Sequence, residues 1–492
     1  MISTDVLIVG AGPTGLALAG ELAAAGVSCA VLERRTAESN LTRAFAVHAR
    51  TLEYLDMRGM GDELAATGAH VPGPRLFGSV NARLSLVKSR YNYLLITPQY
   101  QTEALLERWV RGLGVPIVSG AEVTGLDQDG DGVRVRVRTA EGKEETWETG
   151  YLAGTDGVHS TVRSALGLPF PGRSAIRSLM LADVRLPEPP AAPVLLDGNQ
   201  AGLVFIAPFG DGWYRVITWD RDNQPADDAP LDFEQVRVSV RDVLGTDLGM
   251  REPRWISRFH SDERQVPHYR VGRVLLAGDA AHCHSPAGGQ GMNIGIQDAA
   301  NLGWKLAATV RGQAPTGLLD SYHDERHPVG RAVLRGSGAL LRSITIPSPA
   351  VRAVRNRAIE TVLNLSPAHR RLAELVSGIG TRYPAPRGAH PAVGRRAPDV
   401  PLAGGGRLYE VLRAVRFVLL GPDPAELDAA VRGWDDRVVT AATAGGDWIL
   451  VRPDGYTAWA GRAGDRAGLR AGLAAWCGAS AGAADSGGRA RE

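Results

Sequence analysis

The stretch from residue 6 to residue 33 restricts the possible folds of this chain more than any other. Residues 6–9 form an apolar, β-branched run that leads directly into Gly10-Ala11-Gly12-Pro13-Thr14-Gly15, a G-x-G-x-x-G pattern. An alanine- and leucine-rich helix is predicted next, and a second apolar strand over residues 27–32 ends at Glu33. Strand, glycine turn, helix, strand and acid in this order are typical of a unit that binds a dinucleotide.

Each position of the glycine turn has a physical reason. Gly10 permits the tight turn, Gly12 lets the backbone approach a pyrophosphate, and Gly15 lets helix and strand pack closely. The phosphates are expected to lie against free N–H groups where the helix begins, at Pro13 and Thr14. The acid at the end of the second strand stands about 20 residues further on, where it can accept the ribose hydroxyls. The pattern does not say which dinucleotide binds, and its alternative is an ordinary βαβ turn.

Composition limits the partners of the chain. Its 492 residues suggest about three domains, and 55 basic against 53 acidic residues give a net charge of +2, which provides no electrostatic case for nucleic acid. The three cysteines have neither CxxC nor zinc spacing, as in a reduced cytoplasmic protein. No basic signal segment and no membrane-spanning apolar stretch is present. We therefore expect a cytoplasmic monomer or homodimer that binds neither nucleic acid nor membrane.

A second informative stretch is centred on Asp156-Gly157. A strand is predicted over residues 151–155, and a helix opens near Ser160, a favourable N-cap residue. Ligands bind at the carboxyl ends of strands in such sheets. The alternative is that this stretch is only a strand, turn and capped helix.

A third stretch joins a strand over residues 273–277 to Gly278-Asp279 and then to a glycine-rich loop from Pro286 to Asn293. A long helix is predicted over residues 294–310. A glycine-rich turn at a helix N-terminus offers N–H donors and a positive dipole to a developing anion. Reduced flavin is such an anion, negative around N1 and the C2 carbonyl. A loop of this kind could therefore stabilise such an anion.

His323 and His327 are four residues apart in a predicted helix, a spacing that can bind zinc. The metalloprotease pattern needs Glu directly after the first His, whereas this chain has Asp324. We therefore expect a solvated helix face and no metal.

The remaining segments suggest how the chain is divided. A helix is predicted over residues 44–55, and residues 178–270 are mainly strands, suited to a substrate-binding sheet. A Pro/Gly/Arg-rich linker lies around residues 380–400. The strands and closing helix beyond it resemble a thioredoxin-type module without dithiol chemistry, because Cys477 stands alone.

The three motifs in this order resemble the class A FAD-dependent aromatic hydroxylases, of the phenol-hydroxylase type that includes polyketide-tailoring and rifampicin monooxygenases. The resemblance implies a mixed α/β fold in which a Rossmann-like FAD-binding domain is interleaved with a mainly β substrate domain. The implied division is residues 1–74, 98–175 and 271–345 for FAD, 75–97 and 176–270 for substrate, 346–388 for a helical segment and linker, 389–477 for a thioredoxin-like domain, and 478–492 for a disordered tail.

The same resemblance implies which residues hold FAD. Glu33 would bind the adenosine ribose, Arg43 would lie near the pyrophosphate and the mobile flavin, and Asp279 would bind the ribitol. Gln99 would contact FAD from a helix start, although Gln101 competes for that role. The full set is Gly10, Gly12, Pro13, Thr14, Gly15, Glu33, Arg34, Arg43, Gln99, Val123, Asp156, Gly278, Asp279, Pro286, Gly289, Gly291, Met292 and Asn293.

The implied reaction is hydroxylation of a bulky phenolic or polyketide substrate. NADPH or NADH would reduce FAD, O₂ would add at flavin C4a, and the resulting hydroperoxide would give its terminal oxygen to the ring. A base that forms the phenolate is expected, but no residue is identified for it. Arg43 is a candidate only for flavin mobility or for the peroxide site. The alternatives are Baeyer–Villiger oxygenation, antibiotic inactivation, a flavin-dependent dehydrogenase or reductase without oxygen insertion, and a non-enzymatic flavin sensor.

Overall fold

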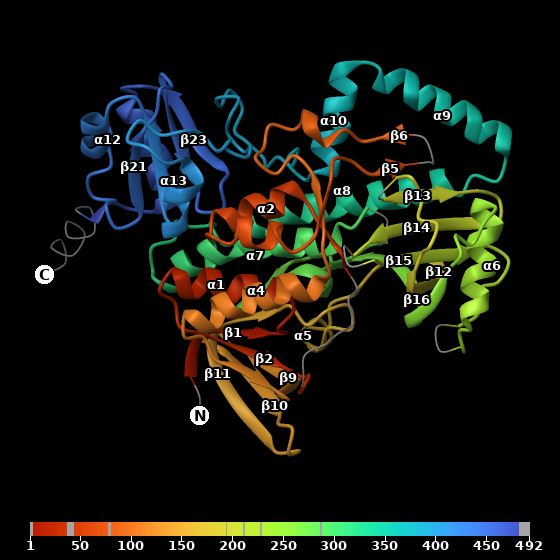
Figure 1. Ribbon diagram of the computed structural model, residues 1–492. Helices are drawn as coiled ribbons and strands as arrows, with labels where there is room; N and C mark the ends of the chain where they lie inside the picture. Colours follow the sequence, from red (N-terminus) through yellow and green to blue (C-terminus); the bar gives the residue numbers. More distant parts are fainter. Residues whose placement is uncertain are drawn as a thin grey trace, which may run out of the picture.

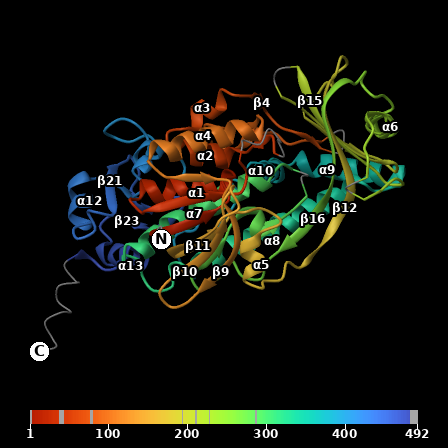
Figure 2. The same cartoon turned by 90° about the horizontal axis from the view of Figure 1, so that it is seen from below.

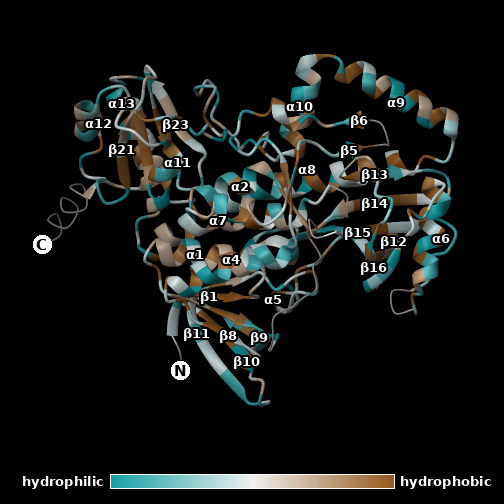
Figure 3. Ribbon diagram, viewed as in Figure 1, coloured by the Kyte–Doolittle hydropathy of each residue, from teal (hydrophilic) through white to brown (hydrophobic). Residues whose placement is uncertain are grey.

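The computed structural model describes residues 3–36, 44–76, 80–192, 194–209, 212–226, 229–285 and 288–481. Figures 1 and 2 show a central part built around α1 and α7, a second sheet at one end of the molecule and the C-terminal module at the other. The apolar residues concentrate in the strands of the three parts (Figure 3). No helix within these ranges is long and apolar enough to cross a membrane.

The central sheet is mainly parallel and has the strand order β17-β18-β11-β1-β2-β8. The first strand lies in the middle, paired in parallel with β2 on one side and β11 on the other. Strand β18 pairs in parallel with β11. The carboxyl ends of β1, β11 and β18 therefore lie beside one another, and each of the three motifs follows one of these strands. The bounds are β1 Ser3–Val9, β2 Cys29–Glu33, β8 Ile117–Ser119, β9 Glu122–Gln128, β10 Val133–Arg138, β11 Glu144–Gly154, β17 Arg270–Val271 and β18 Val274–Leu276.

Helices cover this sheet, and α1 is buried along most of its length because its alanines and glycines allow close approach. A Cβ at Gly20 would lie 2.0 Å from the Trp109 ring of α4, and a Cβ at Gly303 of α7 would lie 2.4 Å from Glu21. The helix bounds are α1 Pro13–Ala24, α4 Gln99–Gly112, α5 Thr161–Ala165, α7 Gly291–Val310 and α8 Ser321–Ile344, with short turns η1 Leu84–Leu86 and η2 Gly278–Ala280.

The predicted helix over residues 44–55 is only partly correct. Ala46–Val47 form the short strand β3, and α2 begins at Ala49 and ends at Asp56. Strand β3 pairs with β7 (Leu94–Ile96), which also pairs with β4 (Ala69–Val71), in a separate three-stranded sheet. These tertiary hydrogen bonds override the helical periodicity of the segment. The short α3 spans Gly61–Ala65.

The second sheet is mainly antiparallel and follows the order β19-β16-β12-β15-β14-β13-β5-β6. Alternate residues face opposite sides, so Val216 packs toward helix α6 whereas Ile217 packs with Phe45 toward the central part. The bounds are β5 Arg75–Leu76, β6 Val80–Asn81, β12 Gly172–Arg185, β13 Leu195–Gly198, β14 Gly202–Pro208, β15 Trp213–Asp220, α6 Phe233–Leu244, β16 Arg251–Gln265 and β19 His282–Cys283.

Two helices, α9 (Pro349–Leu363) and α10 (Ser366–Val376), connect α8 to the C-terminal module. The module has the sheet order β21-β20-β22-β23. Its likeness to thioredoxin stays a prediction, as do the sequence-based domain boundaries. The bounds are α11 Leu408–Val411, η3 Leu412–Ala414, β20 Phe417–Gly421, α12 Pro424–Ala430, β21 Val438–Ala442, β22 Asp447–Val451, β23 Thr457–Arg462 and α13 Arg466–Cys477.

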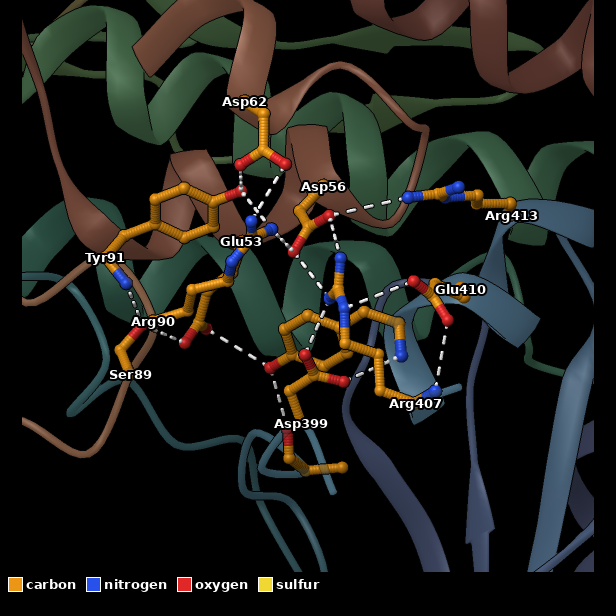
Figure 4. Close-up of polar contacts among 12 residues, drawn as sticks. Glu53, Asp56, Asp62, Ser89, Arg90, Tyr91, Asp399, Arg407, Glu410 and Arg413 are labelled. Atoms are coloured by element: carbon orange, nitrogen blue, oxygen red, sulfur yellow. Dashed lines mark hydrogen bonds and ion pairs between the residues drawn. The ribbon is translucent and has the colours of Figure 1, made fainter. Parts of the chain in front are cut away.

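The C-terminal module docks on α2 through charged groups (Figure 4). Arg407 donates to both carboxylate oxygens of Asp56 at 2.7 Å each and also pairs with Asp399. Deeper in the molecule, Arg452 of the module forms a buried bidentate pair with Glu325 of α8, at 2.7 and 2.9 Å. The module is therefore joined to the central part by ion pairs on two sides.

Candidate active site

The three sequence motifs converge on one cavity of about 510 Å³ at the carboxyl edge of the central sheet. Of the predicted residues, Gly15, Gly278 and Asn293 do not line it. Arg43 and Pro286 lie outside the described residues. The predicted residues that line the cavity are Gly10, Gly12, Pro13, Thr14, Glu33, Arg34, Gln99, Val123, Asp156, Asp279, Gly289, Gly291 and Met292. Gln101 is not among the lining residues.

The glycine turn leaves open space only at its middle glycine. A Cβ at Gly10 (φ +102°) would lie 2.6 Å from the Thr155 carbonyl oxygen, and one at Gly15 would lie 2.0 Å from the Gly10 carbonyl oxygen. A Cβ at Gly12 would meet nothing within 4 Å. The first turn of α1 begins here, and Pro13 occupies a position that needs no N–H donor. The cavity end of the turn can therefore receive a phosphate group.

Glu33 closes the same end of the cavity. Its carboxylate accepts the backbone N–H of Ala11 at 2.8 Å and both the N–H and Nε of Arg35 at 2.9 Å. Burial alone would raise the pKa of Glu33, but the hydrogen bonds from Arg35 and Ala11 outweigh it and hold that pKa below its usual value. The group is thus an anionic acceptor that suits ribose hydroxyls.

Asp156 combines a structural role with its place on the cavity wall. Its carboxylate accepts the Ser160 hydroxyl at 2.5 Å and the Val162 N–H at 3.1 Å, and Ser160 in turn caps α5. Burial raises the pKa of Asp156 in spite of these hydrogen bonds. The Asp156 side chain therefore holds the turn and the capped helix, as the structural alternative predicted. Asp156 also lines the cavity.

Asp279 is exposed toward the cavity, and its carboxylate has no hydrogen-bond partner among the described residues. The turn that presents it is fixed by Asp298, which accepts the Gly278 N–H at 3.1 Å and His282 Nε2–H at 2.7 Å. Arg326 completes this buried cluster by donating to Asp298 at 2.7 Å. The carboxylate of Asp279 is therefore available to accept polyol hydroxyls such as those of ribitol.

The start of α7 forms another part of the cavity wall. The first helical hydrogen bond runs from the Ile294 N–H to the Gln290 carbonyl at 2.9 Å, so the N–H groups of Gly291, Met292 and Asn293 precede the helical ladder. Gly291 and Met292 line the cavity. These N–H groups and the helix dipole can stabilise negative charge on a bound ligand.

Two histidines near this end are neutral at physiological pH. Burial lowers the pKa of His48 to about 4, although its Nε2–H donates to the Gly288 carbonyl at 3.1 Å. Burial also lowers the pKa of His284, which lines the cavity and donates through Nδ1–H to the Ser285 carbonyl at 2.9 Å. Positive electrostatic potential at the α7 end therefore comes from the helix start and not from these imidazoles.

Sequence reasoning missed a buried ion pair on the face of the second sheet that looks toward the cavity. Arg215 donates through Nε to Oδ1 of Asp183 and through Nη2 to Oδ2 of Asp183, both at 2.9 Å. The guanidinium lies 5.8 Å from the ring of Phe45, which lines the cavity and is 5.0 Å from the ring of Phe205. Alternation along β12 and β15 could have placed the pair on this face, but nothing in the sequence linked it to Phe45.

The helix face with His323 and His327 is not the solvated face that the sequence predicted, because His327 is buried and His323 is only partly exposed. His323 Nδ1 accepts the Tyr269 N–H at 3.3 Å, and His327 Nε2–H donates to the Val266 carbonyl at 3.1 Å. Across the described ranges, no group of three or more His, Cys, Asp or Glu side chains is arranged to hold a metal ion.

The residues around the cavity fit FAD. The glycine turn suits the pyrophosphate, Glu33 the adenosine ribose, Asp279 the ribitol, and the start of α7 the electron-accepting edge of the flavin. These donors and acceptors line a single cavity.

Comparisons with known proteins agree with this geometry. The family model described as "FAD binding domain" matches residues 3–337, and that described as "Aromatic-ring hydroxylase, C-terminal" matches residues 390–480. A 12-dehydrotetracycline 5-monooxygenase/anhydrotetracycline 6-monooxygenase from Streptomyces rimosus is 43% identical over 482 residues, which cover 92% of this chain and 95% of that protein. A rifampicin monooxygenase from Streptomyces venezuelae is 39% identical over 465 residues, covering 93% and 95%. The solved OxyS anhydrotetracycline hydroxylase from Streptomyces rimosus superposes with a TM-score of 0.86 at 41% identity, covering 97% of this chain and 100% of that one.

Proposed function

Since this chain belongs to the family of FAD-dependent aromatic-ring hydroxylases, we propose that it uses NADPH or NADH and O₂ to hydroxylate a bulky phenolic substrate. Membership makes it an FAD-dependent monooxygenase of the polyketide-tailoring type, and the mixed α/β fold predicted from the sequence is confirmed. The observation that supports the finer proposal is the single cavity shared by Gly12, Glu33, Asp279 and the start of α7.

The two ends of the cavity have different tasks in this proposal. Gly12 and Glu33 hold the adenosine half of FAD and take no part in the chemistry. When bound, the flavin supplies the reduction by NAD(P)H and the activation of O₂ that the family resemblance implies. The N–H groups of Gly291 and Met292 stabilise the negative charge that reduction places on the pyrimidine edge of the flavin. Arg43 and Pro286 lie outside the described residues, and their contacts with FAD stay a proposal.

The substrate is proposed to lie between the start of α7 and the second sheet. This face is apolar, with Phe45, Phe205 and Leu181, and it carries the Arg215–Asp183 pair as a polar feature. An aromatic, partly polar ligand suits such a surface. Two relatives are named for anhydrotetracycline and rifampicin, which are large polycyclic phenols. We propose the same class of substrate for this chain.

The proposal is tested by NADPH and NADH consumption of the yellow holoenzyme across a panel of polycyclic phenols that includes anhydrotetracycline and rifampicin. A true substrate accelerates NAD(P)H oxidation and yields a product heavier by one oxygen atom. If every phenol leaves the rate at its basal value, the proposed substrate class is wrong. The position of the added oxygen separates ring hydroxylation from Baeyer–Villiger insertion and from inactivation of an antibiotic.

A further inference from the structure

Gln290 is a polar residue of the cavity wall that stands in the glycine-rich loop, directly before α7. It lines the cavity, and its side chain is partly exposed. Its carboxamide caps no N–H group of α7 and has no hydrogen-bond partner elsewhere among the described residues. The N–H donor and the oxygen acceptor of this amide are therefore available to a ligand in the cavity.

Three neighbouring side chains are bound to the protein itself. Asn293 joins β3, α2 and the loop through three hydrogen bonds, and the rings of His48 and His284 each donate to a backbone carbonyl within residues 285–288. Gln290 takes no part in this network. Its amide is therefore not needed to hold the loop in place.

The backbone of Gln290 is anchored although its amide is not. Its carbonyl accepts the Ile294 N–H at 2.9 Å, which is the first hydrogen bond of α7. The amide nitrogen lies 3.9 Å from the position that a Cβ on Gly288 would occupy, so the side chain runs along the loop. A fixed helix start thus carries the amide next to the N–H groups of Gly291 and Met292.

The charges around this helix start give a neutral donor particular weight. Asp279 places a carboxylate oxygen 4.0 Å from the position of a Cβ on Gly291. Burial lowers the pKa of His48 to about 4 and also lowers the pKa of His284, so neither ring supplies positive charge at neutral pH. Negative charge on a ligand at this place is therefore stabilised by neutral N–H donors, to which the Gln290 amide adds one.

We propose that the Gln290 carboxamide binds the pyrimidine edge of the flavin, donating Nε2–H to a ring carbonyl and accepting the flavin N3–H through Oε1. This edge offers two carbonyl acceptors on either side of one N–H donor, which an amide with both functions matches. The inference rests on the proposed function, in which the start of α7 holds the same edge. Since a hydrogen bond to a charged acceptor is the stronger one, Gln290 favours the reduced, anionic flavin and raises its reduction potential.

The reduction potential of the bound flavin tests this inference, because it compares the affinities for the two oxidation states. Gln290→Leu removes both hydrogen bonds with little change in volume. It should weaken binding of reduced relative to oxidised FAD by roughly tenfold, or about 30 mV for a two-electron couple. Gln290→Glu brings a negative charge to the same place and should lower the potential further. Both variants should keep the thermal stability of the wild-type apoprotein, because the native amide bonds to no other described residue.

Glu122→Gln is the matched control for a change of charge in the same cavity. Glu122 lines the cavity beside Glu33, since the Ala121 N–H donates to the Glu33 carbonyl at 2.9 Å. The substitution changes the charge by one unit, as Gln290→Glu does, but next to the proposed ribose site. It should leave the reduction potential at the wild-type value.

Binding of N3-methyl-FAD to the apoprotein tests the acceptor half of the amide. Methylation removes the N3–H donor, so wild type should bind the analogue roughly fivefold less tightly than FAD, whereas Gln290→Leu should bind the two alike. Three results would overturn the inference: equal potentials in wild type and Gln290→Leu, equal shifts in Gln290→Glu and Glu122→Gln, or the same preference for FAD over the analogue in wild type and Gln290→Leu. A chain that binds no FAD at all would refute the proposed function together with this inference, so the two failures are distinguishable.

Discussion

Asn293 accepts a hydrogen bond through Oδ1 from the backbone N–H of His48, at 2.8 Å, across 245 residues of sequence. Its Nδ2 donates to the carbonyls of Ala46 and Gly289, both at 2.8 Å. One side chain at the start of α7 thus holds strand β3, the beginning of α2 and the glycine loop together. Its side chain therefore shapes the cavity wall beside the start of α7, while its backbone N–H belongs to the helix start.

Asn293→Ala is expected to weaken FAD binding by about 10- to 100-fold. The change leaves the buried N–H of His48 and the carbonyl of Ala46 without partners, and each unmet hydrogen bond costs roughly 1–3 kcal/mol. The dissociation constant of FAD from the apoprotein, followed by flavin fluorescence, measures the effect. Unchanged affinity would mean that the position of β3 does not matter for the cofactor.

Gln99 and Gln101 give a paired comparison within one helical turn. Gln99 lines the cavity, accepts the Ala44 N–H at 2.9 Å and donates to Glu103 at 2.8 Å. Gln99→Ala should therefore weaken FAD binding by roughly fivefold, as expected for the loss of about 1 kcal/mol. Gln101→Ala should leave FAD affinity at the wild-type value. Equal losses in the two variants would show that the helix start, and not the cavity contact, matters.

Asp298→Asn should both destabilise the fold and reduce the FAD content of the purified protein. Asp298 and Arg326 are fully buried, so the change leaves the guanidinium without a carboxylate, at a cost of roughly 3–5 kcal/mol. The turn that presents Asp279 loses its anchor in the same step. Asp320→Asn is the control, because that pair with Arg270 is exposed at Asp320 and worth about 1 kcal/mol or less. Thermal unfolding and the ratio of flavin to protein distinguish the two variants.

Acid should unfold the protein partly through Glu325. Burial opposes ionisation, but Arg452 and Lys305 outweigh it and lower the pKa of Glu325 from 4.5 to about 2. A carboxyl with a lowered folded pKa stabilises the protein above its unfolded pKa, and this contribution of about 3 kcal/mol disappears as pH falls from about 4.5 toward 2.

Urea unfolding at several pH values between 6 and 3 measures this contribution. The free energy of unfolding of the wild type should fall more steeply over that range than that of Glu325→Gln, which lacks the titrating group. If the free energies of unfolding of the two proteins fell in parallel with pH, Glu325 would not contribute to acid unfolding.

Short sequence patterns predicted the helices, strands and turns whose structure depends on their own residues alone. The glycine turn, Glu33, Gly278-Asp279 and the start of α7 were identified from short motifs, and the structure places them around one cavity. The C-terminal strands and the closing helix were predicted from local patterns in the same way. Motifs of this kind fix backbone geometry locally, so they can be recognised without tertiary information.

The parts that could not be predicted depend on contacts between distant segments. The 44–55 segment has helical periodicity, yet pairing with β7 and the hydrogen bonds of Asn293 make its first residues a strand. Asp298 lies inside a helix where nothing marks it as the anchor of the Gly278 turn. The Arg215–Asp183 pair likewise becomes visible only once burial is known.

The source of the oxygen atom in the product tests the central claim most directly. The holoenzyme is given NADPH and a phenol that accelerates NADPH oxidation, under a gas phase of oxygen-18, and the product is analysed by mass spectrometry. Incorporation of one oxygen-18 atom from O₂ into each hydroxylated product is the predicted result. A product without the label, or one labelled only from oxygen-18 water, would contradict monooxygenation and would instead favour a flavin-dependent dehydrogenase or reductase.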